Sequence, residues 1–250
     1  MRVDLNADLG ETVDGMPTAD DDAMFAVISS ANVACGGHAG DAASMRASVE
    51  RAIRFGVAVG AHPSYDDREN FGRVARSPEP GELRASVTAQ LSALVAAGAD
   101  LRYVKPHGAL YHAVTADPRQ AEAVASAVAD HSARVGRALP ILGLSGAIAE
   151  AAACAGLPFV QEAFLDRGYT ARGGLVPRGE PGDLVRDPET VADRALRLVH
   201  DGEVDTVDGA RVCVDAASLC LHGDTPAAVA MARAVRSALD GAGIEVRAPW

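Results

Sequence analysis

Short apolar segments alternate with amphipathic helical patterns along nearly the whole chain, and no other feature of the sequence constrains the fold as strongly. This alternation is typical of successive βα units, in which each helix returns the chain to the same edge of a parallel sheet. We therefore predict a single α/β domain over residues 1–250, folded as a βα barrel with about seven parallel strands. The expected strands are residues 3–8, 30–35, 57–62, 102–107, 141–144, 159–164 and 218–222.

Several helix starts are marked by capping residues. Asp41 is expected to cap one helix, because its carboxylate can accept hydrogen bonds from the first free amides. Proline follows Asp117, Asp187 and Thr225, and in each case we expect the proline at the first helical position.

Two segments interrupt the βα rhythm. Residues 204–214 alternate around Asp208-Gly209, which predicts a β-hairpin with a type I′ turn. Residues 166–184 contain five glycines and two prolines, too many residues for a plain connection in a compact domain. A connection of this length is usually a lid or a binding loop.

Composition excludes several classes of partner. The formal net charge of −11 and the pI near 5.0 leave no basic surface for nucleic acid or anionic membranes. The N-terminal segment is too acidic for a signal peptide, and no stretch approaches the ~18 apolar residues of a membrane span. The four cysteines form no C-x-x-C pair, as expected in a reducing compartment. We therefore expect a cytoplasmic protein.

The polar residues gather at the C-terminal ends of the predicted strands. In a parallel barrel these ends meet at one mouth, where active sites are assembled. The alternative is that some of them, such as those in the first strand, lie on a solvent-exposed face. The residues concerned are Asn6, Asp8, Glu11, Cys35, His38, His62, Lys105, His107, Glu162, Asp166, His222 and Asp224.

Lys105 is the only lysine among 23 basic residues. Lysine differs from arginine in carrying a compact charge whose pKa responds to burial. We interpret Lys105 as a position that requires an ammonium group, the alternative being that one lysine has survived by chance.

A glycine-rich turn from Cys35 to Asp41 is expected to join a strand to a helix. Free amides at a helix start bind anions, so Gly36, Gly37 and His38 are candidates for holding a phosphate or a carboxylate. The glycines could equally serve a tight turn alone, and one Cys-x-x-His pair is a weak signal for a metal.

His62, His107 and His222 favour either acid–base chemistry or a metal site, and the residues alone do not separate the two. No G-x-x-x-x-G-K-[ST] or G-x-G-x-x-G motif is present, which excludes a P-loop or Rossmann nucleotide site. G-x-S-x-G is also missing, so a hydrolase elbow is unsupported.

Six segments together are similar to one known family. They are residues 4–11, 31–41, 60–63, 105–111, 162–169 and 220–224. Through them the chain resembles the LamB/YcsF lactam-utilisation family, also called the family of 5-oxoprolinase A subunits, from residue 1 to about residue 245.

The resemblance implies an irregular TIM-like barrel of the glycoside hydrolase/deacetylase type. It also implies ATP-dependent cleavage of 5-oxo-L-proline to L-glutamate with partner subunits B and C, ATP with Mg²⁺ as co-substrate, and no organic prosthetic group. We hypothesise that Asp8 is the base that orients water, that Lys105 neutralises developing negative charge and that His107 shuttles protons. Candidates for binding substrate or phosphate are Asn6, Glu11, Gly36, Gly37, His38, His62, Glu162, Asp166, Arg167, Arg172, His222 and Asp224.

Two alternatives remain open at this point. One is a metal-dependent amidohydrolase or deacetylase with Asp8, His38 and His62 as ligands. The other is a non-catalytic subunit that presents the lactam to its partners. The sequence does not indicate which subunit binds ATP, or whether the chain forms a homo-oligomer.

Overall fold

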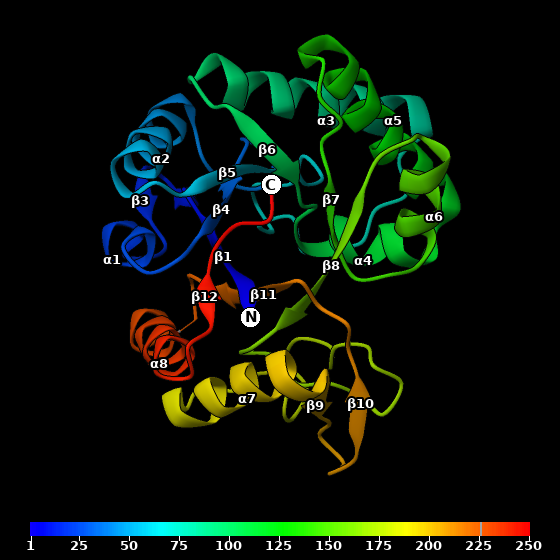
Figure 1. Cartoon of the computed structure of the whole chain (residues 1–250). Helices are drawn as coiled ribbons and strands as arrows, with labels where there is room; N and C mark the ends of the chain where they lie inside the picture. Colours follow the sequence, from blue (N-terminus) through cyan, green and yellow to red (C-terminus); the bar gives the residue numbers. More distant parts are fainter. Residues whose placement is uncertain (226) are drawn as a thin grey trace.

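The computed structural model, which describes residues 1–225 and 227–250, contains a closed barrel of parallel strands (Figure 1). The hydrogen-bonded order is β11-β8-β7-β6-β5-β4-β1, and pairing of β1 with β11 closes the barrel. The predicted seven-stranded α/β barrel is therefore confirmed. The strands are β1 (Arg2–Leu9), β4 (Ser30–Ala34), β5 (Ala58–His62), β6 (Leu101–Val104), β7 (Ile141–Gly143), β8 (Phe159–Phe164) and β11 (Ser218–His222).

Helices surround the barrel and cover the outer faces of its strands (Figure 1). They are α1 (Asp21–Phe25), α2 (Ala42–Phe55), α3 (Pro80–Ala96), α4 (Gly108–Ala116), α5 (Pro118–Val135), α6 (Ala147–Cys154), α7 (Pro188–Asp201) and α8 (Ala228–Gly241). Within the described residues, we find no helix with the length and apolar character needed to cross a membrane.

The predicted helix starts agree with the structure where it describes them. Asp41 accepts hydrogen bonds from the amides of Ala43 and Ser44 at the start of α2. Helices α5 and α7 begin with the expected prolines, after Asp117 and Asp187. The predicted helical Pro226 lies outside the described residues.

The inside of the barrel is polar near the start of its strands. Asp4 is buried there, and its carboxylate accepts hydrogen bonds from the hydroxyls of Ser29, Ser30 and Ser218 at 2.5–2.7 Å. Burial raises the pKa of Asp4 to about 6, although the three hydroxyl donors oppose the shift. Leu5, the next residue, points outward into the hydrophobic core, as alternation along a strand requires.

Aromatic side chains close this N-terminal end of the barrel. Trp250 stacks on Tyr103 with ring centroids 4.2 Å apart, and its indole N–H donates to the hydroxyl of Ser30. Gly60 makes room for the tyrosine, because a Cβ at this position would lie 2.2 Å from the ring. The short strand β12 (Glu245–Val246), which pairs with β1, brings the C-terminal residues to this end.

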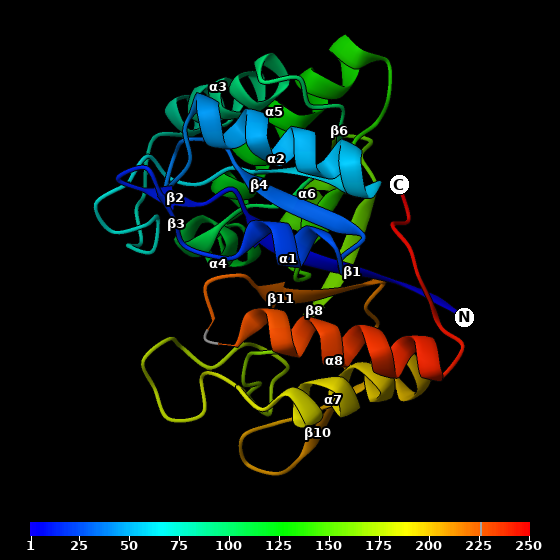
Figure 2. The same ribbon diagram turned by 90° about the vertical axis from the view of Figure 1, so that its left-hand side faces the viewer.

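The opposite end carries the long connections (Figure 2). The hairpin of β2 (Thr12–Val13) and β3 (Met16–Pro17) and the loop at residues 166–184 both lie on this side. Isolated bridges between Arg167 and Leu184 and between Tyr169 and Leu175 tie the long loop to itself. The C-terminal ends of the strands therefore open toward these loops.

The predicted hairpin near residue 208 is present, but its turn differs from the expectation. Strands β9 (Glu203–Asp205) and β10 (Arg211–Cys213) pair antiparallel across the intervening segment 206–210. Gly209 has a positive φ but Asp208 does not, so the type I′ prediction is wrong. The Asp208 carboxylate instead accepts hydrogen bonds from Thr206 and from the amide of Ala210, which fixes a longer turn.

Candidate active site

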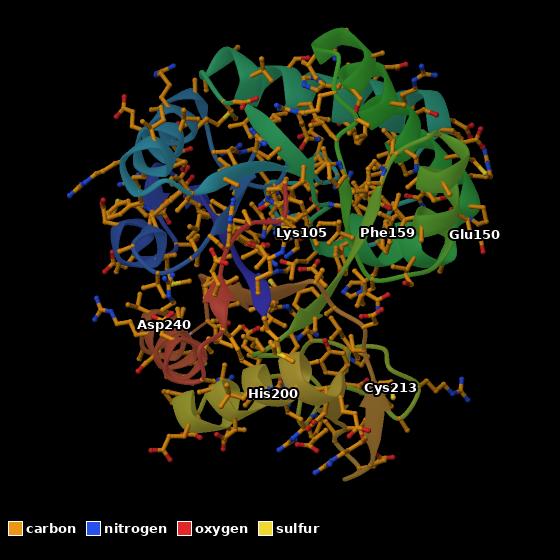
Figure 3. All side chains as sticks on the ribbon, in the orientation of Figure 1. Lys105, Glu150, Phe159, His200, Cys213 and Asp240 are labelled. Atoms are coloured by element: carbon orange, nitrogen blue, oxygen red, sulfur yellow. The ribbon has the colours of Figure 1, made fainter. Side chains whose placement is uncertain are left out.

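The C-terminal ends of the barrel strands enclose a cavity of about 620 Å³. Asp8 of β1, His62 of β5 and His222 of β11 line it, together with Lys105 and His107, which directly follow β6. Figure 3 shows Lys105 in the interior, far from the peripheral helices. These five of the twelve predicted polar residues therefore share one opening.

Lys105 is 1% exposed, and its ammonium is surrounded by acceptors. The Nζ atom lies 3.0 Å from Glu162 Oε2, 3.2 Å from Asp8 Oδ1, 3.2 Å from Asn6 Oδ1 and 3.1 Å from Cys220 Sγ. Burial alone would lower the pKa of Lys105, but Asp8, Cys220 and Glu162 hold that pKa well above its usual range. The only lysine of the chain is therefore a permanent buried cation at the base of the cavity.

Asn6 and Glu162, predicted to bind substrate or phosphate, lie beneath the cavity. Asn6 donates to the hydroxyl of Ser218 at 2.7 Å and accepts from Asn32 and Lys105. Both residues contact the Lys105 ammonium from the interior of the barrel.

Asp8 presents one carboxylate oxygen to the interior and one toward the histidines. Its Oδ1 accepts from Asn32 at 2.7 Å, and its Oδ2 lies 3.4 Å from His62 Nε2 and 4.0 Å from His222 Nε2. Burial would raise the pKa of Asp8, but His62 and Lys105 lower it well below its usual range. Asp8 is therefore an ionised acceptor at the cavity wall.

Three histidine rings pack together beside Asp8. His38 stacks on His107 with centroids 3.6 Å apart, and His107 Nδ1 lies 3.0 Å from His62 Nε2. Burial and the neighbouring imidazoles hold the pKa values of His38 and His107 well below the usual range. Both rings are therefore neutral near pH 7.

Glu11 completes this cluster from the segment that follows β1. Its Oε1 lies 2.9 Å from His38 Nε2 and 3.6 Å from His107 Nδ1. Burial, and then the charge of Asp8, raise the pKa of Glu11 to about 8. A protonated Glu11 can donate a hydrogen bond to His38 Nε2, so each of these two buried groups has a hydrogen-bond partner.

His222 stands on the opposite side of Asp8. Its Nδ1 lies 3.0 Å from Asp166 Oδ1, and Asp166 also accepts from the backbone of His222 and the hydroxyl of Thr225. Burial opposes a charged imidazole, but Asp166 raises the pKa of His222 above its usual value. Asp166 thus orients His222 within the protein, and His222 is the member of the pair that lines the cavity.

The glycine-rich turn after β4 does not have the predicted anion-binding geometry. The amides of Ala43 and Ser44 at the start of α2 already donate to Asp41, which leaves neither for a phosphate. Gly37 is required for packing, because a Cβ there would lie 2.5 Å from Ser64 Oγ. Gly36 has a φ of +96°, which favours glycine on conformational grounds. Neither glycine lines the cavity.

The long loop supplies one cavity arginine that was not predicted from the sequence, Arg178, beside the predicted Arg167 and Arg172. The predicted Arg167 lines the cavity; it is buried and donates to the carbonyls of Asp183 and Val176, so it also holds the loop in place. Arg172 is exposed and does not line the cavity, whereas Arg178 does. Because the loop has no periodic pattern, the sequence carried no signal to distinguish these two arginines.

Arg73 is a second missed residue, and it also lines the cavity. It lies in the connection between β5 and α3 and forms an ion pair with Asp224 at 2.6 Å. The motif reasoning found Asp224 but not its partner. Asp224 therefore positions a cationic group at the mouth of the cavity.

Two groups of ligand-type atoms could hold a metal ion among the described residues. Asp8, His62 and His107 form one, and Glu11, His38 and His107 form the other; within each group the ligand atoms lie within 4.8 Å of one another. The predicted set of Asp8, His38 and His62 is not one of them, because His38 Nε2 faces Glu11. Cys35 points to the carbonyl of Val33 and accepts from the amide of His62, in keeping with a structural role.

Fold and cavity together define a class of protein. Barrel enzymes carry out their chemistry at the C-terminal ends of their strands, where this chain places a buried ammonium, ionised carboxylate and neutral histidines. The chain is therefore of the βα-barrel class, with a polar centre of the kind used for acid–base or metal-assisted reactions.

Comparison with known proteins gives the particular family. The chain belongs to the LamB/YcsF family, which it matches over residues 3–249. It is 51% identical over 251 residues to a Streptomyces griseus protein named as the A subunit of 5-oxoprolinase, covering 98% of this chain and 99% of that protein. A Cutibacterium acnes protein of the same name is 47% identical over 251 residues, covering 98% of each chain.

A solved structure agrees with this assignment. The lactam utilization protein from Thermus thermophilus is 44% identical and superposes with a TM-score of 0.92, covering 99% of this chain and all of that one. The barrel of the present chain is therefore the fold of its family.

Proposed function

We propose that this chain is the A subunit of an ATP-dependent 5-oxoprolinase, which cleaves 5-oxo-L-proline to L-glutamate with partner subunits B and C. The observation that carries the proposal is the buried, charged Lys105 beside the ionised Asp8 at the base of the cavity. The names of the relatives from Streptomyces griseus and Cutibacterium acnes support the substrate and the assembly.

The chemistry requires both an activated carbonyl and an energy source, because a five-membered lactam is a stable amide. Transfer of the γ-phosphoryl group of ATP to the lactam oxygen yields a better electrophile and ADP. Water then adds to the lactam carbonyl carbon. The C–N bond breaks as the nitrogen takes up a proton, and a γ-glutamyl phosphate remains. A second water hydrolyses it, so one 5-oxoproline, one ATP and two waters yield glutamate, ADP and phosphate.

Residues of the polar cluster can stabilise the charge that develops at each step of this reaction. Lys105 offsets negative charge that develops on the lactam oxygen, and a preorganised donor of this kind contributes about 3 kcal/mol to a transition state. Asp8 accepts a hydrogen bond from the attacking water and orients it. His107 and His62, in contact at 3.0 Å, pass the proton toward the leaving nitrogen.

Cationic groups at the mouth suit the carboxylate of 5-oxoproline. Arg73 and Arg178 both line the cavity, and a guanidinium binds a carboxylate through paired hydrogen bonds. The cavity volume of about 620 Å³ lies within the range of small-molecule sites, roughly 300–1,000 Å³. The sequence carries no P-loop or Rossmann motif, so we assign ATP, with its Mg²⁺, to a site completed by the partner subunits.

Reconstitution tests the proposal. The three subunits together should release ADP and glutamate only when 5-oxoproline is present, and omission of this chain should abolish both. At a temperature at which the variant is shown to remain folded, Lys105→Met should lose turnover by about 100-fold or more. If the complex without this chain turns over normally, the proposal fails. If Lys105→Met and the other cavity variants keep full turnover while this chain alone binds 5-oxoproline, the chain is a lactam-presenting subunit instead.

A further inference from the structure

Three acceptor atoms, from β1, from β5 and from the segment after β6, converge on one point of the cavity wall. His62 Nε2 lies 3.0 Å from His107 Nδ1 and 3.4 Å from Asp8 Oδ2. All three side chains are buried, and all three line the cavity. The point between them is therefore enclosed by protein and reachable from the cavity.

The hydrogen bonds on the far side of each ring fix the imidazole tautomers. His62 Nδ1 lies 2.7 Å from the carbonyl oxygen of Lys105, and His107 Nε2 lies 3.0 Å from that of Phe71. A carbonyl oxygen can only accept, so both of these ring nitrogens carry a hydrogen. When each ring carries a single hydrogen, on the nitrogen that faces the carbonyl, the two facing nitrogens are both lone pairs, and Asp8 adds a carboxylate oxygen.

Such a convergence suits a bound cation. One proton lies on the line between two atoms and can satisfy one pair, whereas a metal ion accepts all three donors at once. Ligating histidines almost always donate their second N–H to a carbonyl or carboxylate, which is the arrangement of His62 and His107. The second group, Glu11 with His38, differs because one shared proton satisfies its 2.9 Å contact.

The donor spacing also suits a transition-metal ion. Ligand bonds of about 2.0–2.1 Å to nitrogen or carboxylate oxygen, at angles between 90° and 110°, place two donors about 2.9–3.4 Å apart. The separations of 3.0 Å and 3.4 Å around His62 both lie in this range.

We propose that Asp8, His62 and His107 form a site for one divalent transition-metal ion, with two imidazoles and one carboxylate as protein ligands and an open position facing the cavity. Zn²⁺ and its substitute Co²⁺ suit this donor set, whereas Mg²⁺ and Ca²⁺ prefer oxygen ligands. If the proposed function holds, the ion would supply the activation of water, and Asp8, His62 and His107 would serve as its ligands in place of water orientation and proton transfer. Metal binding itself does not depend on that function.

Direct binding tests the site on the isolated full-length chain, without lactam, ATP or partner subunits. The chain is stripped with a chelator, dialysed and titrated with Co²⁺ while its visible absorption is followed, and Zn²⁺ stoichiometry is measured by elemental analysis after equilibrium dialysis. We expect one ion per chain. His62→Asn and His107→Asn should each weaken binding at least 100-fold, and His200→Asn, on the exposed end of α7, should match the wild type.

A measurement on the unmodified chain avoids any folding defect in the variants. Zn²⁺ should shift the ¹⁵N resonances of the ring nitrogens of His62 and His107 and leave those of His131 and His200 unchanged. Absence of stoichiometric binding, or equal binding by the two variants, overturns the proposal. Ring signals that respond to pH but not to Zn²⁺ also overturn it, because they identify a shared proton instead. A failure of 5-oxoproline turnover in the presence of bound metal counts only against the proposed function.

Discussion

Replacement of the buried ammonium by a neutral side chain of similar length, Lys105→Met, should destabilise the fold strongly. Lys105 Nζ lies 3.0 Å from Glu162 and 3.2 Å from Asp8, and at an effective dielectric constant of 20 each contact corresponds to about 5 kcal/mol of Coulomb attraction. Desolvation of the ammonium offsets much of this attraction. Removing one partner of a buried pair leaves its acceptors uncompensated, and typically costs about 3–5 kcal/mol.

Urea unfolding of the two proteins measures the difference directly, provided that the slope with denaturant is unchanged. The double variant Lys105→Met/Glu162→Gln should recover at least 1 kcal/mol of the loss, because it removes one of the uncompensated carboxylates. Arg84→Met breaks an ion pair with Asp130 that is about half exposed, and it should cost no more than about 1 kcal/mol. A loss below 1 kcal/mol for Lys105→Met would refute the reasoning.

Three further predictions concern other parts of the molecule. Burial raises the pKa of Asp4 to about 6. The unfolding free energy of the wild type, relative to that of Asp4→Asn, should therefore fall by up to about 3 kcal/mol as the pH rises from 4 to 6. A difference between the two proteins that does not change with pH in urea unfolding would contradict this. Gly60→Ala should cost about 1–3 kcal/mol in thermal unfolding because its methyl overlaps a tyrosine ring, whereas Gly81→Ala has open space and should cost nothing. In steady-state kinetics of the assembled enzyme, Arg178→Ala should raise KM for 5-oxoproline about tenfold or more, since a hydrogen bond to a charged group contributes about 1.5–3 kcal/mol. Arg186→Ala, on an exposed part of the chain just beyond the same loop, should not change KM.

Much of the fold could be predicted because it depends on local pattern. Most barrel strands carry polar residues at or just beyond their C-terminal ends, and parallel closure brings those ends together. Asp8 and His222, for example, are far apart in the chain but lie opposite each other in the register of β1 and β11. The general location of the site therefore followed from the strand ends alone.

The details of the site depend on contacts that sequence pattern does not encode. His38 follows β4 and His62 ends β5, yet the Nε2 atom of His38 faces Glu11 instead of Asp8, because its ring orientation is set by Ser64 and by stacking on His107. At the start of α2, the Asp41 carboxylate itself accepts from the amides of Ala43 and Ser44, so these two amides are not available to an anion.

Loop residues were the least predictable part of the site. Arg178 and Arg73 line the cavity through irregular connections, where no periodicity indicates the direction of a side chain. The turn at Asp208-Gly209 shows the same limit, since hydrogen bonds of the Asp208 carboxylate favour a longer turn than the dipeptide suggests.

A single resonance can test the central claim, that 5-oxoproline binds beside a buried ammonium at the C-terminal mouth of the barrel. The chain has one lysine, so labelling with ¹⁵Nζ-lysine yields one side-chain ammonium signal, that of Lys105. The signal should persist as an ammonium above pH 10.5 and should shift saturably on titration with 5-oxo-L-proline, but not with L-proline, which lacks the lactam carbonyl. A signal that titrates as an exposed lysine, or that 5-oxoproline leaves unchanged at every concentration, would contradict the account.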